Sequence, residues 1–153
     1  MRIHKIISGG QTGADRAALD FAIAHGIPHG GWCPCGRREE DGVIDARYQL
    51  TETPNEDPAQ RTEWNVRDSD GTVIFSIGRT LRGGSKLTAE LAAKYHKPWL
   101  HLSRERDGET ATKMLLEFLA EHRINTLNVA GPRQSQEPDV GKFVCGTMAA
   151  ART

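Results

Sequence analysis

Short apolar runs alternate along this chain with longer segments of helical periodicity, and this alternation limits the possible fold more than any other feature. The clearest apolar run, residues 72–77 (TVIFSI), is followed by a glycine loop and then by a helical pattern. Strands separated by helical patterns of about 10–15 residues are typical of βαβ units, which build a mostly parallel sheet covered by helices. The sequence therefore predicts an α/β fold, a three-layer sandwich with a mostly parallel sheet, and we expect residues 1–153 to form a single domain.

The same patterns predict the individual elements. Strands are expected at residues 3–7, 27–32, 72–77, 98–102 and 127–130, and helices at about 14–25, 58–66, 85–95, 107–122 and 140–148. Asp57 is the predicted N-cap of the second helix because a proline follows it, and Ser85 is the predicted N-cap of the third. Residues 33–58 are expected to form a long loop, and loops of this length in compact domains are commonly functional.

Three of the predicted strands are followed by loops that contain glycine, with the sequences SGGQTGAD, GRTLRGGS and AGPRQS. Right-handed crossovers bring the carboxyl ends of parallel strands to one edge of the sheet, and ligands of open α/β sheets bind beyond those ends. We expect each loop to lead into a helix, whose free N–H groups and dipole favour an anion. The sequence thus predicts an anion-binding cleft at this edge, with plain strand-to-helix turns as the alternative.

The candidate ligand-binding residues are the glycines and polar residues of these loops: Ser8, Gly9, Gly10, Gln11, Thr12, Gly13, Asp15, Gly83, Gly84, Ser85, Thr88, Arg133 and Ser135. Arg133 is the strongest single candidate, because a guanidinium can bind phosphate through two parallel hydrogen bonds. Asp15 would be repelled by a phosphate, so it either complements a helix dipole or accepts from a ligand hydroxyl or ring N–H. We expect Gly10 to lie against the anion, so that Gly10→Asp abolishes binding and leaves the fold largely intact.

Two arginines of the long segment are open to two interpretations. Arg37 and Arg38 either reach an anion or are neutralised by the acidic residues that follow them, Glu39, Glu40 and Asp41.

Composition and cysteine spacing weigh against several other classes of protein. Twenty basic and twenty acidic residues cancel, so the chain has no basic footprint for polymeric nucleic acid. No apolar run approaches the ~18–20 residues of a membrane span, and no secretory signal pattern is present. The three cysteines make no disulfide framework, which favours a cytoplasmic protein. Cys33 and Cys35 form a CxC pair without a matching second pair, so we expect no protein-held metal.

Several motifs together resemble those of a known family. The stretches SGGQTGADRAALDFA, GGWCPCGRREEDGVI, TEWNVRDSDGTVIF, GGSKLTAEL, KPW and NVAGPRQS closely resemble the molybdenum-cofactor carrier proteins, over essentially the whole chain up to about Phe143. The resemblance implies a Rossmann-like fold and a homo-oligomer, a dimer or tetramer. It also implies that the molybdenum cofactor (molybdopterin), a phosphorylated pterin, is bound as cargo in an anion cleft for molybdenum enzymes. Gly141 and Gly146 in the last helix would allow a close subunit contact, or equally packing on the sheet.

The same family is related to the cytokinin-activating phosphoribohydrolases, and the comparison bears on catalysis. Their GGxGTxxE signature resembles GGSKLTAE here, which ends at Glu90 but has Lys86 and Leu87 in place of the inner Gly-Thr. A second departure from the carrier pattern is Cys35, where a basic residue is expected. We therefore expect a binding, storage and carrier protein with no catalytic residue. The alternative is a nucleotide-processing phosphoribohydrolase that acts on nucleoside monophosphates through Glu90.

Overall fold

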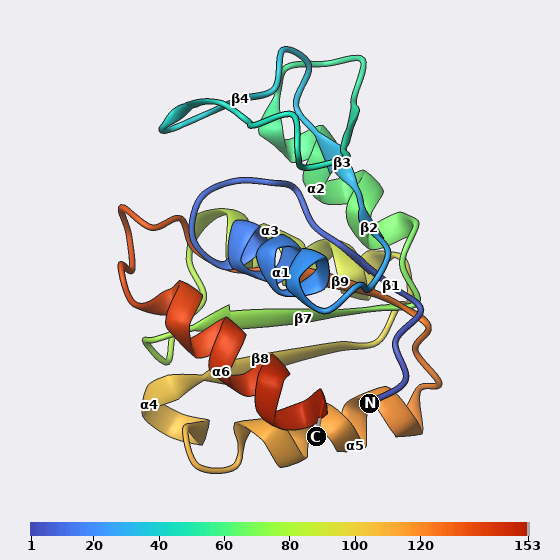
Figure 1. Ribbon diagram of the computed structural model, residues 1–153, viewed down its shortest axis with the longest axis vertical. Helices are drawn as coiled ribbons and strands as arrows, with labels where there is room; N and C mark the ends of the chain where they lie inside the picture. The colour runs from blue at the N-terminus through green and yellow to red at the C-terminus, as the bar shows by residue number, and fades with distance from the viewer. Residues whose placement is uncertain (153) are drawn as a thin grey trace.

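A five-stranded sheet forms the centre of the computed structural model, which describes residues 1–152 (Figure 1). Its spatial order is β2 (His29–Gly30), β1 (Lys5–Ile7), β9 (Thr126–Ala130), β7 (Gly71–Ser76) and β8 (Trp99–Ser103). Each neighbouring pair is parallel. The last strand, β9, inserts between β1 and β7, so the loops that follow these three strands leave the sheet side by side. The predicted α/β fold with a mostly parallel sheet is confirmed.

Helices cover both faces of the sheet. On one face lie α1 (Ala14–Ala24), α5 (Ala111–Glu121) and α6 (Val140–Arg152), and on the other lie α2 (Pro58–Arg67) and α3 (Gly83–Lys94). In Figure 1, α1 and α6 are in front of the sheet and α3 is behind it. The main core fills the first face, because alternate residues such as Val73, Phe75, Leu127 and Val129 point there.

The opposite face of the sheet is more polar. Thr72 and Asn128 lie on it side by side, and the Asn128 amide donates to the Thr72 hydroxyl at 3.2 Å. This more polar face is the one that α2 and α3 cover, and Asn128 also lines the cavity described below.

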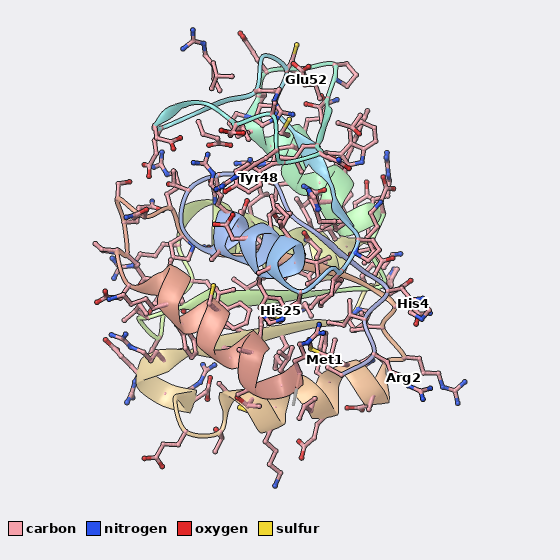
Figure 2. The ribbon with its side chains drawn as sticks, viewed as in Figure 1. Met1, Arg2, His4, His25, Tyr48 and Glu52 are labelled. Carbon is pink, nitrogen blue, oxygen red and sulfur yellow. The ribbon has the colours of Figure 1, made fainter. Side chains whose placement is uncertain are left out.

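The segment predicted as one long loop, residues 33–58, contains short strands and a small core. Here β3 (Trp32–Cys33) pairs with β6 (Thr51–Glu52), and β4 (Arg38–Glu39) forms a hairpin with β5 (Gly42–Val43). Apolar side chains of the segment pack on Leu19 of α1. Tyr48, labelled in Figure 2, donates to Asp20 of α1 at 2.6 Å. The segment is therefore fixed to the outer side of α1.

Arg37 is the reason that this segment keeps its shape. Its guanidinium donates to the backbone carbonyls of Ile44, Asp45, Tyr48 and Leu50. Those donors hold the segment in a closed loop, and Arg37 does not line the cavity described below. The sequence left two interpretations of Arg37 open, an anion contact and neutralisation by the adjacent acids, and neither describes these contacts.

The ends of the helices agree with the prediction from the sequence in some places and differ from it in others. The Asp57 carboxylate accepts from the Ala59 amide at 3.0 Å, which confirms the predicted N-cap of α2. The prediction for Ser85 was wrong, because α3 begins at Gly83 and the residue at its N-cap position is Arg82. The helix predicted at 107–122 is the shorter α5, and a separate short helix, α4 (Arg104–Asp107), precedes it. Ser103 is the N-cap of α4, and its hydroxyl accepts from the Arg106 amide, while the Asp107 carboxylate accepts from the Ser103 amide at 3.0 Å. No helix within residues 1–152 is long and apolar enough to cross a membrane.

Candidate functional site

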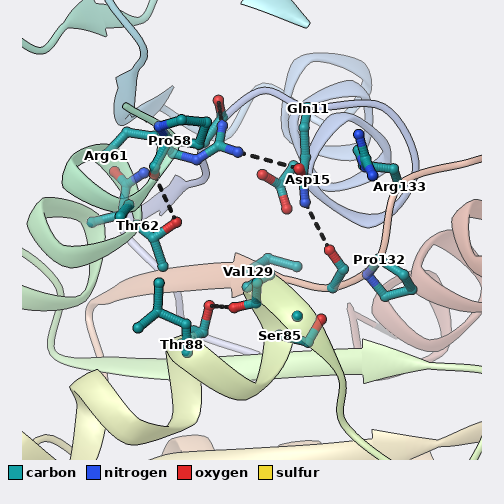
Figure 3. A pocket seen from close by; sticks show the side chains of 18 of the residues that line it. Gln11, Asp15, Pro58, Arg61, Thr62, Ser85, Thr88, Val129, Pro132 and Arg133 are labelled. Atoms are coloured by element: carbon teal, nitrogen blue, oxygen red, sulfur yellow. Dashed lines mark hydrogen bonds between the residues drawn. The ribbon is translucent and has the colours of Figure 1, made fainter. Parts of the chain in front are cut away.

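A cavity of about 340 Å³ opens at the carboxyl edge of the sheet (Figure 3). Its walls are the loop after β1, the helix α2, the N-terminus of α3 and the loop after β9. The volume lies in the range of about 300–1,000 Å³ that is usual for small-molecule sites. The predicted site residues that line it are Gly9, Gln11, Asp15, Gly83, Gly84, Ser85, Thr88 and Arg133.

The remaining predicted site residues hold the loops together and do not line this cavity: Ser8, Gly10, Thr12, Gly13 and Ser135. Ser8 donates from its hydroxyl to the Asp15 carbonyl at 2.9 Å, and so closes the first loop on itself. At Gly13 the φ angle is +84°, and a Cβ there would come within 2.4 Å of the Pro132 carbonyl oxygen. Glycine at this position lets the first and third loops touch.

The position of Gly10 also differs from the expectation that this residue lies against the anion. Its φ angle is +79°, and a Cβ would point at Leu50, 2.5 Å from Cδ1, and at Ile44, 3.2 Å away. Gly10 thus faces the small core under residues 33–58 rather than the cavity. For this reason we expect Gly10→Asp to destabilise the fold, in contrast to the expectation from the sequence.

Two of the predicted anion donors already bind a carboxylate of the chain. Glu40 accepts hydrogen bonds from the hydroxyls of Thr12 and Ser135 and from the Ser135 amide. The guanidinium of Arg133 lies 3.9 Å from the same carboxylate. The Ser135 hydroxyl, followed by that of Thr12, lowers the pKa of Glu40 below its usual value. Glu40 therefore binds the third loop through Ser135 and does not neutralise Arg37 and Arg38.

A buried ion pair joins α2 to β4, and the same arginine joins α2 to the first loop by hydrogen bonds. Arg61 donates to Glu39 at 2.8 Å and to the Gly9 carbonyl at 2.9 Å, and its second terminal nitrogen donates to the Gln11 side chain at 3.2 Å. The two charged side chains are only 7% and 8% exposed. A Cβ on Gly9 would come within 2.7 Å of Arg61, so this glycine makes room for the guanidinium. Sequence reasoning missed Arg61, because an arginine within a polar helix is ordinarily exposed.

Asp15 lies in the first turn of α1, 4% exposed, and lines the cavity. Its Oδ1 atom is fully buried and has no hydrogen-bond partner within residues 1–152. Burial raises the pKa of this carboxyl to about 7, against the opposing effect of Arg61. Figure 3 shows Asp15 between Gln11 and the interior of the cavity. A buried carboxyl oxygen without a partner is a natural place for a ligand donor.

The N-terminus of α3 has the features of an anion site. No side chain caps it, and a Cβ on Gly83 or Gly84 would meet nothing within 4 Å. Arg82 and Ser85 line the cavity beside these glycines. The first amides of a helix have no intrahelical acceptors, and together with the helix dipole they favour an anion.

The third predicted loop does not open a helix directly, since α6 begins at Val140, although Arg133 of this loop lines the cavity. Glu90 is exposed on α3 and is not among the residues that line the cavity. Within the described part of the chain, no group of three or more His, Cys, Asp or Glu residues is placed to hold a metal ion.

A parallel sheet between two helical layers, with a cavity at the strand carboxyl ends, defines a Rossmann-like α/β protein. Residues 6–151 match the circularly permutated YpsA SLOG family, and the chain belongs to this family. A crystal structure from Syntrophus aciditrophicus SB, provisionally named as a molybdenum carrier protein, has 49% sequence identity and a TM-score of 0.96. The similarity covers 99% of this chain and 96% of that chain. No curated protein matches significantly. These similarities confirm the resemblance that the motifs indicated.

Proposed function

We propose that this protein binds and carries the molybdenum cofactor, a phosphorylated pterin, with the phosphate at the N-terminus of α3. The observation that carries the proposal is the uncapped helix end at Gly83 and Gly84, which opens into a cavity that also contains the buried Asp15 carboxyl. An anion and a hydrogen-bonding head group of one ligand could occupy these two places together.

The chemistry around α3 supports a phosphate there. The Gly83 and Gly84 amides lie in the first turn, and the absence of side chains allows close approach of ligand oxygens. Arg82 adds positive charge beside these glycines, and Arg133 lines the cavity from the loop after β9. The provisional name of the relative with 49% identity, molybdenum carrier protein, agrees with a cofactor cargo. On this proposal the recipients of the cargo are molybdenum enzymes.

Glu90 bears on the choice between binding and hydrolysis. A carboxylate that assists glycosidic cleavage has to lie beside the sugar of the ligand. Glu90 is exposed and outside the cavity lining, so the geometry favours a binding protein.

Substitution of Gly84 tests the proposal without disturbing the fold. A side chain has free space there, and an aspartate in the first turn of a helix stabilises it by about 0.3–1 kcal/mol. The same carboxylate would lie beside the bound phosphate. At about 4 Å and an effective dielectric near 20, the repulsion is about 4 kcal/mol. We expect Gly84→Asp to weaken binding of 6-hydroxymethylpterin phosphate at least about 100-fold.

Gly84→Asn is the matched control, because it has nearly the same size and no charge. Binding is followed by pterin fluorescence, and folding by thermal unfolding. Gly84→Asn should lose much less affinity than Gly84→Asp. A wild-type protein that neither carries a pterin after purification nor binds the phosphate ester at micromolar concentration would overturn the proposal.

A further inference from the structure

We propose that Asp15 recognises the pyrimidine edge of the pterin, and that its carboxyl pairs with the ring N–H and the exocyclic amino group. The inference rests on the proposed function and specifies it further. Asp15 would then be the residue that selects a 2-amino-4-oxo ring, while the N-terminus of α3 binds the phosphate.

The carboxyl of Asp15 is available because its neighbours are engaged elsewhere. Arg61 is the nearest candidate partner, but its guanidinium donates to Gly9, Glu39 and Gln11. No ion pair within 4.0 Å joins it to Asp15 in the described part of the chain. The Ser8 hydroxyl donates to the Asp15 carbonyl rather than to its side chain. A carboxyl that is 4% exposed and lines the cavity is thus left with one buried oxygen unpaired.

The charges that face Asp15 determine which ligand group can approach it. Arg61 on α2 attracts negative charge, Glu39 on β4 repels it, and the backbone amides of Gln11 and Gly9 favour the ionised carboxyl. The Arg61 and Glu39 charges are paired with each other. A second anion would therefore be repelled, whereas a neutral group with N–H donors would be bound. Two adjacent N–H groups on one ring edge match the two oxygens of a carboxylate, as the guanidinium of arginine does.

Proton release on binding is a measurable sign that the Asp15 carboxylate pairs with the N–H groups of the ring. Burial raises the pKa of Asp15 to about 7, so near neutral pH a substantial fraction of the carboxyl is protonated. Donation from two N–H groups stabilises the ionised form and lowers the pKa. Binding of a pterin near pH 7 should then release protons. A lumazine ring has a carbonyl in place of the amino group, so it presents an acceptor and should release none.

The experiment compares 6-hydroxymethylpterin phosphate with 6-hydroxymethyllumazine phosphate by calorimetry near pH 7, in two buffers of different ionisation enthalpy. The wild-type protein should bind the pterin at least about tenfold more tightly than the lumazine, with proton release for the pterin alone. Asp15→Asn should remove or reverse the preference for the pterin, because an amide offers one donor and one acceptor. It should also abolish the difference in proton release between the two ligands. Asp20→Asn, the same change on α1 outside the cavity, should behave as wild type.

The outcomes separate the two proposals. Equal affinities for the two rings, or tighter binding of the lumazine, would overturn the role of Asp15 and leave the carrier function standing. Absence of binding by both phosphate esters would overturn the carrier function and, with it, this inference. If Asp15→Asn does not fold, the ring preference and proton count of the wild-type protein still decide the question.

Discussion

Glu40 accepts two hydrogen bonds from Ser135, one from the backbone amide at 3.3 Å and one from the hydroxyl. The two residues are 95 positions apart, so this contact ties the β4–β5 hairpin to the loop after β9. Both Ser135 and Thr12 were expected to bind an external anion. Because a carboxylate of the chain already occupies their donors, we propose the N-terminus of α3 as the anion site instead.

The Glu40 contact should make stability depend on pH. Hydrogen bonds from Ser135 and Thr12 lower the pKa of Glu40 from 4.5 in the folded state, so its contribution is complete above that value. The contribution is lost as the pH falls through the lowered pKa. Glu40→Gln should therefore reduce the Tm at neutral pH and differ less from wild type in acid. Thermal unfolding of both proteins across this range checks the prediction, and a constant Tm difference would contradict it.

Asp15 should have the opposite effect. Its folded pKa is raised from 3.8 to about 7 by burial, so the folded state holds a proton that the unfolded chain releases. The free energy of unfolding then decreases as the pH rises through this interval, because the carboxyl ionises in the unfolded chain while it stays protonated in the folded protein. Asp15→Asn should be more stable than wild type above pH 7, with the difference shrinking towards pH 4. Urea unfolding at several pH values measures this, and a variant less stable at pH 8 would refute it.

Arg61→Ala should be strongly destabilising. The change leaves the Glu39 carboxylate, 8% exposed, without its partner. Breaking a buried ion pair from one side costs about 3–5 kcal/mol. Arg67→Ala on the same helix removes an exposed pair with Asp68 and should cost about 1 kcal/mol or less. Urea titration compares the two variants, and equal losses would show that the buried pair contributes no more than the exposed one.

Gly10 should be sensitive to any side chain. Alanine there is strained by the positive φ, at about 1–2 kcal/mol, and Leu50 has to move. Gly10→Asp should cost more, since it directs a carboxylate at Leu50 and Ile44. Thermal unfolding of both variants is the measurement. A Gly10→Asp protein with wild-type stability would show that the segment over α1 moves aside freely.

The chain should form a homo-oligomer, as the resemblance to carrier proteins implies. Gly141 of α6 approaches Ala17 of the same chain, so it does not argue for a subunit contact, whereas a Cβ on Gly146 would meet nothing within 4 Å. The apolar face of α6, including Phe143 and Met148, is also buried within the chain. Light scattering over a concentration series measures the mass in solution. A monomer mass at every concentration would refute the expectation.

Local pattern predicted most of the fold, because a parallel sheet between helices leaves a regular signature. The apolar run at 72–77 became β7, and the Asp57-Pro58 cap marked the start of α2. Ser85 was misplaced because glycines at 83 and 84 suggest a loop, whereas Gly83 begins the helix with a φ of +50°. A glycine-rich helix start looks the same as a loop in sequence.

The candidate site was predicted less completely, since its polar contacts join distant parts of the chain. Arg61 and Gly9 are 52 positions apart, and no local pattern places α2 against the first loop. Glu40 stands beside two arginines in sequence yet binds Thr12 and Ser135 in space. Asp15 was predicted to be a possible hydrogen-bond acceptor for a ligand, because its carboxylate would be repelled by a phosphate. Its burial without a partner became visible only with Arg61 and Glu39 in place.

The placement of two different contacts in one cavity has a consequence for cargo transfer. On the proposed function, inorganic phosphate, which is abundant in cells, would compete for the end of α3 but would make no hydrogen bond with Asp15. When one end of a ligand that is bound at both ends detaches, the other end keeps it at a high local concentration beside its site. Such a ligand therefore resists competition by phosphate. Because the two ends of the ligand are bound separately, they also detach one after the other. A recipient that captures one end while the other is still held can complete the transfer without the cofactor ever being free in solution.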